Sequence, residues 1–323
     1  MEDILRKLNL LRTLTGLACV ISLAACAAPA AQPTAAVELP TAAPTSLPAT
    51  ATQEPTATAQ PSATLQPTAT PTLAPTAELS PTPDERLKPR DWAAWAVIPT
   101  VSAMAREIYE RGIANGNDAH VFSVVGDCQS EPNVFLGIYE TNRNPISSDA
   151  ADLLETIEYY RGSFSRTSLA VRDGLSAPSA LTAMWADPES CEPNENPVQC
   201  ELRVRKPAIM FVNLGTNWKP GASAEAYEGY LRQIIDLIIA NGTLPILSTK
   251  ADNVELDHSI NAATARVAYD YDIPLWNFWS AANHLPNHGL DADRENVYLT
   301  PDGWDVRNYT GLKTLDAVRR ALQ

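Results

Sequence analysis

The chain has 323 residues and a formal net charge of −14 at neutral pH. A surface that binds nucleic acid needs a basic face to neutralise phosphates, so this charge balance argues against a nucleic-acid partner. Hydrophobic residues make up 45% of the sequence, which is enough for a globular core. About half of the 26 prolines lie between Pro29 and Pro89, so we expect one ordered domain of roughly 230 residues after that stretch.

The first 26 residues have the features of a bacterial lipoprotein signal. Arg6, Lys7 and Arg12 precede an apolar run from about Leu14 to Ala25, which is too short to span a bilayer comfortably. The run ends in Leu-Ala-Ala-Cys, which is similar to a lipobox, in which the cysteine is acylated and becomes the new N-terminus. We therefore expect an exported protein anchored in the cell membrane by a lipid on Cys26, with its domain on the extracellular side. The alternative is an ordinary signal peptide in which this cysteine occurs by chance.

Residues 27–89 repeat Pro-Thr-Ala units, contain no aromatic residues and carry few charges. Such a segment cannot bury enough apolar area to offset the entropy lost on ordering. We expect a disordered, semi-extended linker that holds the domain away from the membrane. Residues 90–323 then form the domain, and the membrane is contacted only through the N-terminal lipid.

Strand-like and helix-like segments alternate along residues 90–323. Short apolar runs rich in β-forming residues predict strands at Val121–Val125, Ser168–Val171, Pro207–Leu214, Leu244–Ser248 and Pro274–Phe278. Apolar residues at helical spacing predict helices at Val101–Ala114, Ser148–Tyr160, Ser179–Trp185, Ala224–Ala240, Ser259–Tyr269 and Tyr309–Leu322. This alternation predicts βαβ crossovers, and thus an α/β domain with a mostly parallel five-stranded sheet between two layers of helices.

Cys191 and Cys200 bracket a polar loop rich in proline and asparagine. In an exported protein two such cysteines are expected to form a disulfide, which typically contributes about 2–4 kcal/mol of stability. No further pair of cysteines or histidines lies nearby, so we predict no metal site. Cys128 is then the odd thiol of the domain.

Three of the predicted strands end in small or polar residues: Gly126-Asp127-Cys128, Gly174, and Gly215-Thr216-Asn217. Ligands of parallel α/β sheets bind at the carboxyl ends of the strands. In this order the three blocks resemble the SGNH (GDSL-type) hydrolase family, and the resemblance covers about Ala119 to Gln323. It implies a three-layer, flavodoxin-like fold and hydrolysis of esters, commonly acyl groups on carbohydrates or lipids.

The resemblance also implies roles for these residues. Cys128 stands where the family has its nucleophilic serine, and a thiol can perform acyl transfer if a base or a lowered pKa activates it. The backbone N–H groups of Cys128 and Gly174 and the side chain of Asn217 would form the oxyanion hole, in which each donor typically contributes about 10²–10³-fold in rate. Ser130 is the alternative nucleophile.

The general base is not given by the motif. The family places Asp-x-x-His before its final helix, but residues 290–305 contain no histidine. Aligning the motif with residues 295–298 puts Tyr298 at the base position, whereas aligning it with residues 302–305 puts Asp305 there. Our expectation is that His288 replaces the family base, because Gly289 permits a turn that could direct it inward, and that Asp291 orients it.

Other polar residues near the strand ends are candidates for lining a pocket: Asp127, Gln129, Ser130, Lys250, Asp252, His258 and Tyr298. The sequence has no glycine-rich phosphate loop and no cluster of metal ligands, so we predict no cofactor.

Two functions remain open at this stage. The first is a surface-anchored esterase that removes acyl groups from an extracellular glycan or a small ester, using Cys128. The second is a binding module with the same fold, which holds a carbohydrate but has lost turnover. A thiol that acts alone, as a redox sensor, is a weaker third hypothesis. The position of the imidazoles relative to the Cys128 sulfur distinguishes the first two, and in each case we expect a monomer.

Overall fold

The computed structural model of the protein describes residue 84 and residues 86–141, 151–219, 221–294 and 297–323. The predicted lipid attachment at Cys26 and residues 27–83 of the predicted linker lie outside the described residues, as does the start of the helix predicted from Ser148. No helix within the described ranges combines the length and the apolar character needed to cross a membrane.

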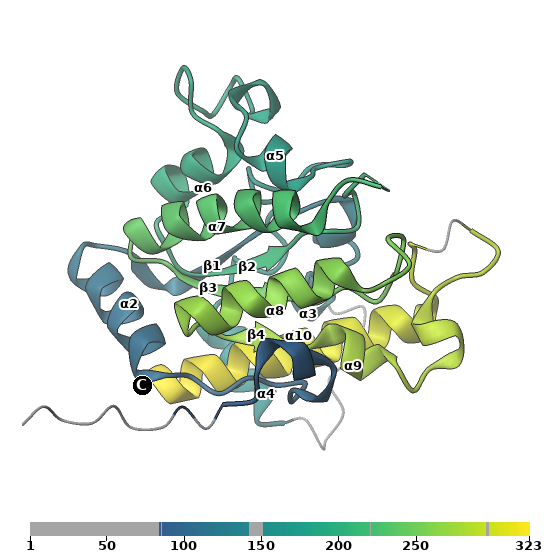
Figure 1. The fold of residues 1–323 in the computed structure, drawn as a ribbon. Helices are drawn as coiled ribbons and strands as arrows, with labels where there is room; N and C mark the ends of the chain where they lie inside the picture. Colours follow the sequence, from purple (N-terminus) through teal and green to yellow (C-terminus); the bar gives the residue numbers. More distant parts are fainter. Residues whose placement is uncertain (1–83, 85, 142–150, 220, 295–296) are drawn as a thin grey trace, which may run out of the picture. The chain divides into compact units, whose positions relative to one another are not determined.

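The core is a parallel sheet of four strands in the order β1-β2-β3-β4 (Figure 1). The strands are β1 (Asp118–Gly126), β2 (Pro207–Asn213), β3 (Leu244–Ser248) and β4 (Leu275–Trp276). All seven residues of β2 are buried, as expected for a strand covered on both faces.

The predicted strand that is missing from this list, residues 168–171, contributes only a single parallel bridge between Val171 and Gly126. It continues no further because its backbone turns: Ala170 N donates to Ser168 Oγ at 3.1 Å and Val171 N donates to Ser168 O at 3.1 Å. Counted in chain order, the five segments lie in the spatial order 2-1-3-4-5. This is the order of flavodoxin-like sheets, and the predicted α/β fold class is confirmed.

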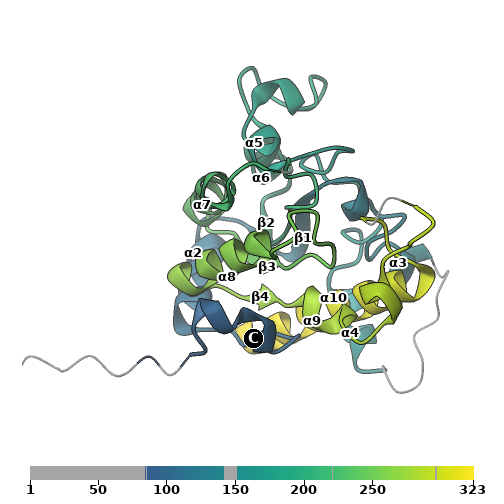
Figure 2. The ribbon, with the colours of Figure 1, turned by 45° about the vertical axis from the view of Figure 1, so that its right-hand side comes forward.

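Helices cover both faces of the sheet. Figures 1 and 2 show α7 (Ala224–Ala240) and α8 (Ser259–Tyr271) on one side and α4 (Leu153–Tyr159) and α10 (Pro301–Leu322) on the other. The remaining helical segments are η1 (Pro89–Ala94), α2 (Ala103–Ala114), η2 (Cys128–Ser130), α3 (Ile138–Thr141), α5 (Ala177–Ala180), η4 (Ala183–Trp185), α6 (Pro197–Arg205), α9 (Phe278–Ala282) and η5 (Pro286–Gly289).

Several elements differ from the sequence-based expectation. The helix predicted at Ser179–Trp185 is divided into α5 and η4, and the strand predicted at Pro274–Phe278 is only β4, because α9 begins at Phe278. α10 begins at Pro301 rather than at Tyr309, because Thr300 caps it by accepting a hydrogen bond from Gly303 N at 3.1 Å. α6 was not predicted, although Asn196 and Gln199 form a reciprocal capping box and Pro197 occupies its first turn. The loop before α6 is polar and gives no apolar periodicity, so the sequence pattern did not indicate where the helix begins.

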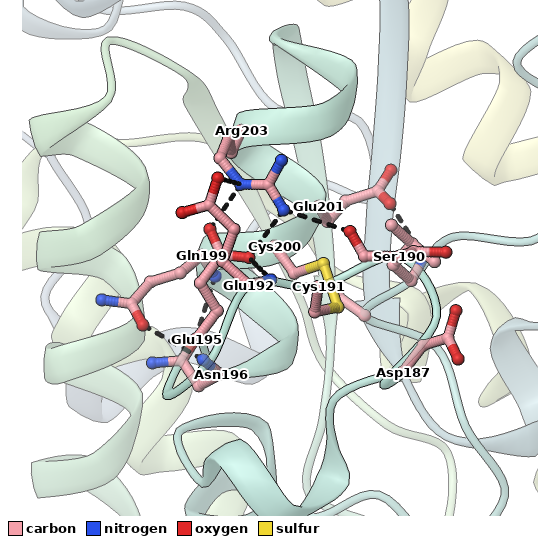
Figure 3. The surroundings of a disulfide bond; sticks show 12 residues. Asp187, Ser190, Cys191, Glu192, Glu195, Asn196, Gln199, Cys200, Glu201 and Arg203 are labelled. Atoms are coloured by element: carbon pink, nitrogen blue, oxygen red, sulfur yellow. Dashed lines mark hydrogen bonds and ion pairs between the residues drawn. A yellow bond between two sulfur atoms is a disulfide. The ribbon is translucent and has the colours of Figure 1, made fainter.

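The predicted disulfide between Cys191 and Cys200 is confirmed, with the two Cα atoms 5.2 Å apart. It joins the loop before α6 to the middle of that helix (Figure 3). Arg203 reinforces the same connection, since its guanidinium donates to Glu195 Oε1 at 2.6 Å and to Ser190 O at 3.1 Å. The loop is therefore held to α6 by a covalent bond and by an ion pair.

Among the described residues, those that contact the domain include Asp84, which precedes the predicted boundary at residue 90. Arg86 forms an ion pair with Asp272 at 2.7 Å, and its guanidinium lies 4.1 Å from the centre of the Tyr269 ring. Asp84 and Lys88 each hydrogen-bond to the Tyr269 hydroxyl. The proline-based boundary missed these charged residues, which join the end of the linker to α8.

Candidate functional site

The register of the strands brings two of the predicted blocks and the loop after β3 to one edge of the sheet. Gly126 at the end of β1 is the register partner of Asn213 at the end of β2, and Ser248 at the end of β3 donates to Asn213 Oδ1 at 2.8 Å. The loops that follow these strands carry Asp127–Ser130, Thr216-Asn217 and Lys250–Asp252. They consequently surround one crevice at the carboxyl edge, as ligand sites in parallel sheets do.

Asp127 is the centre of this arrangement. Its carboxylate is only 3% exposed and accepts hydrogen bonds from Gln129 N at 3.0 Å and from Asn217 Nδ2 at 3.2 Å. Burial raises the pKa of Asp127 to about 6, because desolvation disfavours the charged form more than its hydrogen bond from Gln129 N and the nearby Arg307 favour it. Asp127 therefore fixes both the turn at Cys128 and the side chain of Asn217.

Glycine is required at position 126, where the chain turns away from the sheet. A Cβ atom there would lie 2.3 Å from Ser130 Oγ and 2.8 Å from Asn213 O. Ser130 is itself buried and its hydroxyl has no hydrogen-bond partner among the described residues. The structure thus places the alternative nucleophile beneath the turn, against Gly126.

Cys128 is partly exposed and carries a free thiol. The side chain of Asp173 lies near enough to the thiol to influence its ionisation. Burial raises the pKa of Cys128 to about 11, with further contributions from the carboxylates of Asp127 and Asp173. In the described part of the chain no imidazole is hydrogen-bonded to the thiol, so its surroundings favour the neutral form.

The loop that carries Asp173 and Gly174 is held by a buried ion pair. Glu201 of α6 is fully buried and accepts hydrogen bonds from Arg166 at 2.8 Å, from Ser123 Oγ at 2.5 Å and from Leu169 N at 2.8 Å. Because Ser123 belongs to β1 and Leu169 to the bridging segment, this network fixes the loop relative to the central strand.

Two of the proposed oxyanion donors lie close to this loop. Gly174 has a φ of 72°, a conformation that favours glycine. Asn217 is exposed, but its Nδ2 donates to Leu175 O at 3.3 Å as well as to Asp127. An oxyanion would have to compete with these two acceptors for the amide of Asn217.

The histidines lie in other environments. His258 packs its ring against Trp92 and Trp279, with centroid distances of 6.1 and 5.6 Å, and burial lowers its pKa. His284 and His288 are exposed. Asp291 bonds through its backbone N to Tyr298 O at 2.9 Å, and no hydrogen bond between the described atoms joins its carboxylate to His288.

The chain between η5 and α10 closes the crevice from one side. Leu290 and Leu299 form an antiparallel bridge, and Gln129 Nε2 donates to Val297 O at 2.8 Å. Val297 and Leu299 line the crevice. Tyr298 stands between them in a bend, and the guanidinium of Arg294 lies 3.8 Å from the centre of its ring. Asp305, the other aligned position, is exposed on α10.

A buried cluster of charges occupies much of the crevice. Lys250 is 8% exposed and forms ion pairs with Asp252 at 2.5 Å and Glu255 at 2.7 Å. Thr216 Oγ1 donates to Asp252 Oδ2 at 2.8 Å. The free volume is about 30 Å³, room for roughly two water molecules. The strand-end crevice is therefore nearly filled by the protein's own side chains.

Sequence reasoning missed two residues of this region. Arg307 is buried, donates to Gln129 O and lies 4.4 Å from the centre of the Phe135 ring, while burial lowers its pKa to about 10. It was overlooked because α10 was expected to begin after it. Asp173 was treated only as the end of a strand. It directly precedes Gly174, a proposed oxyanion donor, and this sequence position could have suggested that its carboxylate lies near the nucleophile.

The site offers no evident place for a metal ion. Among the described residues, the one group of three potential ligands within reach of one another is Cys191, Glu195 and Cys200, and its two sulfur atoms are joined in the disulfide. The carboxylates and amides around Cys128 can instead accept and donate hydrogen bonds to a polar organic ligand.

Comparison with known proteins gives distant structural matches. No protein-family model and no curated protein matches the chain. Similar solved structures include a lipase/acylhydrolase from Enterococcus faecalis, 15% identical, which covers 60% of this chain and 94% of its own, with a TM-score of 0.41. A GDSL-like lipase from Bacteroides thetaiotaomicron VPI-5482 is 14% identical, covers 66% of this chain and 97% of its own, and has a TM-score of 0.41.

A third similar structure, TesA, is 17% identical, covers 61% of this chain and 99% of its own, and has a TM-score of 0.40. These likenesses are too distant to assign an activity. We therefore base the functional proposal on the surroundings of Cys128.

Proposed function

We propose that this domain is a binding module with a hydrolase-type α/β fold, which holds an extracellular carbohydrate without cleaving it. The observation that carries the proposal is the environment of Cys128. Burial and nearby carboxylates raise the pKa of its thiol, and no imidazole in the described residues accepts a hydrogen bond from it. A nucleophile in these surroundings has neither a base nor a lowered pKa.

The size of the effect supports this reading. A thiol with a pKa of about 11 is ionised in roughly one molecule in 10⁴ at pH 7. General base catalysis, which would compensate, typically contributes about 10²–10⁴-fold. His120 lies near the start of β1, His284 and His288 are exposed, and His258 packs between two tryptophans. None of these imidazoles hydrogen-bonds to the thiol, so none is placed to accept its proton.

The charges around the site favour a neutral, polar ligand. Cys128 lies in the field of Asp127, Asp173 and Glu131, which would repel an anion. Carboxylates and amides are good partners for hydroxyl groups. A carbohydrate offers many hydroxyls and no charge, which suits a domain expected to face the extracellular side.

Ester hydrolysis by Cys128 is the second candidate, because the thiol is partly exposed and the carboxylate of Asp173 lies near it. A carboxylate is a poor base for a thiol of such high pKa. This activity would therefore rise steeply with pH.

Anchoring through Cys26 remains part of the proposal. Cell fractionation tests it: the parent chain should sediment with membranes, and a Cys26→Ala chain should not become lipid-modified or membrane-bound. Equal membrane association of both chains would contradict the anchor.

Binding itself is tested with the purified full chain and a panel of oligosaccharides, some neutral, some acetylated and some anionic, by isothermal titration calorimetry. Mass spectrometry of the recovered ligands reports any chemical change. We expect binding of at least one neutral oligosaccharide, recovered intact. Loss of acetyl groups in the presence of the parent but not of Cys128→Ala would overturn the proposal in favour of an esterase.

A further inference from the structure

We propose that Trp185 is the stacking platform for a sugar ring, and that the ligand is a neutral saccharide held on the outer lip of the site by Trp185, Asp173 and Asn217. This inference rests on the proposed binding function and names the surface that performs it. It also places the ligand outside the strand-end crevice.

The position of Trp185 is fixed relative to Cys128. A Cβ atom at Gly174 would lie 3.9 Å from Cη2 of the Trp185 ring, so the indole lies against the loop that carries Asp173. Arg172 Nη1 donates to Trp185 O at 3.1 Å, and Arg172 N donates to Gly126 O at 3.2 Å. The tryptophan is thus connected through one residue to the end of the central strand.

The side chain of Trp185 packs against the hydrophobic core and leaves part of its surface to solvent, whereas Trp276 is fully buried. None of the described residues accepts a hydrogen bond from Trp185 Nε1. Trp218 donates from Nε1 to Ala222 O while its ring packs edge-on against Tyr227. Met184, next to Trp185, is 84% exposed and extends the apolar surface.

Polar groups flank this platform. The Asp173 carboxylate precedes Gly174 directly, and the exposed Asn217 is tied to Leu175 O on the same loop at 3.3 Å. An aromatic face with carboxylate and amide groups beside it can bind the C–H face of a sugar ring and its hydroxyls at the same time. The carboxylates of Asp127, Asp173 and Glu131 act on Cys128, and the guanidinium of Arg172 lies at Trp185 O, so charges of both signs surround the platform and favour a neutral saccharide over an anionic one.

The crevice cannot serve as the alternative location without rearrangement. Its free volume of about 30 Å³ is far smaller than a sugar ring, and Lys250 is locked between Asp252 and Glu255. A ligand pocket usually measures roughly 300–1,000 Å³. The lip is open to solvent, whereas the crevice is closed by Val297 and Leu299.

The test uses the full chain and three neutral probes, hexamers of β-1,4-linked glucose, xylose and N-acetylglucosamine, with hexagalacturonate as the anionic probe. For a neutral probe that binds, Trp185→Ala should weaken affinity at least about tenfold, and Trp185→Phe should retain most of it. Trp304→Ala, a partly exposed tryptophan on α10, is the matched control and should bind as the parent does. Near-ultraviolet circular dichroism of each variant reports folding.

Each outcome has a separate meaning. If the parent binds none of the neutral probes, the proposed binding function itself fails for this ligand class. If the parent binds and Trp185→Ala binds equally well, only the platform is overturned. Tighter binding of hexagalacturonate than of every neutral probe would contradict the assignment of a neutral ligand.

Discussion

At the scale of single residues, the chemistry of this site is decided by what surrounds the thiol. Cys128 occupies the turn after the central strand, where Asp127 holds the backbone and the nearby carboxylates of Asp127 and Asp173 raise the pKa of the thiol. A sequence motif specifies the position of a nucleophile, but its pKa depends on neighbours that lie far away in the chain. Asp173 and Arg307 are such neighbours.

The thiol of Cys128 should react slowly with iodoacetamide. The raised pKa, about 11 against an ordinary 9.0, lowers the thiolate fraction of Cys128 about a hundredfold at pH 8. A thiolate of higher pKa is also about tenfold more nucleophilic, so the net decrease in reaction rate is about tenfold. We expect alkylation of Cys128 at pH 8 to be about tenfold slower in the folded protein than in urea, measured by mass spectrometry of its peptide. Asp173→Asn should accelerate the reaction, and a rate that levels off below pH 8 would contradict the raised pKa.

Asp127 should make stability depend on pH. Its pKa is about 6 in the folded protein against an ordinary 3.8, so between these values the unfolded chain releases a proton that the folded protein retains. The stability that this group contributes is therefore lost as pH rises from about 4 to above 6, by about 3 kcal/mol in total. We expect the free energy of unfolding of Asp127→Asn, measured in urea, to exceed that of the parent at pH 7.5. At pH 4 we expect no such gain.

The exposed Asp305→Asn on α10 controls for the change from carboxylate to amide. The assignment fails if the difference between Asp127→Asn and the parent is the same at pH 4 and at pH 7.5, since burial of the charge would then have no energetic consequence.

At the scale of elements, the apolar strands were predictable because burial on both faces leaves a continuous hydrophobic run. Pro207–Leu214 predicted β2 (Pro207–Asn213) almost to the residue. Residues 168–171 gave only one bridge, because Ser168 accepts hydrogen bonds that turn the backbone, which no periodicity reveals. The starts of α6 and α10 depend on capping side chains inside polar stretches, where apolar spacing gives no signal.

The disulfide of the α6 loop should contribute to stability mainly through the unfolded chain. A sequence separation of 9 residues corresponds to about 2–3 kcal/mol of loop entropy. We expect Cys191→Ser/Cys200→Ser to lose about this much free energy of unfolding in urea. The fold should persist, because Arg203 still pairs with Glu195. A variant as stable as the parent would show that the ion pair alone closes the loop.

At the scale of the whole domain, the sheet order brings two of the predicted blocks and the loop after β3 to one edge, and this part of the site followed from the sequence. The carboxyl ends of parallel strands meet wherever such a sheet forms. What the sequence could not give is the closure of the crevice by the Lys250 cluster and by residues 297–299, since these contacts join loops distant in the chain. The environment of the histidines depends on the same loop packing.

Turnover of p-nitrophenyl acetate by the full chain at pH 7.5 tests the central claim most directly. It compares the parent with Cys128→Ala and with the double variant Cys128→Ser/Tyr298→His, which introduces a serine nucleophile and a histidine at one of the two positions considered for the base. We expect the parent and Cys128→Ala to be indistinguishable from the uncatalysed rate, with any gain confined to the double variant. Turnover by the parent that disappears in Cys128→Ala would contradict the account and identify the protein as a cysteine-dependent esterase.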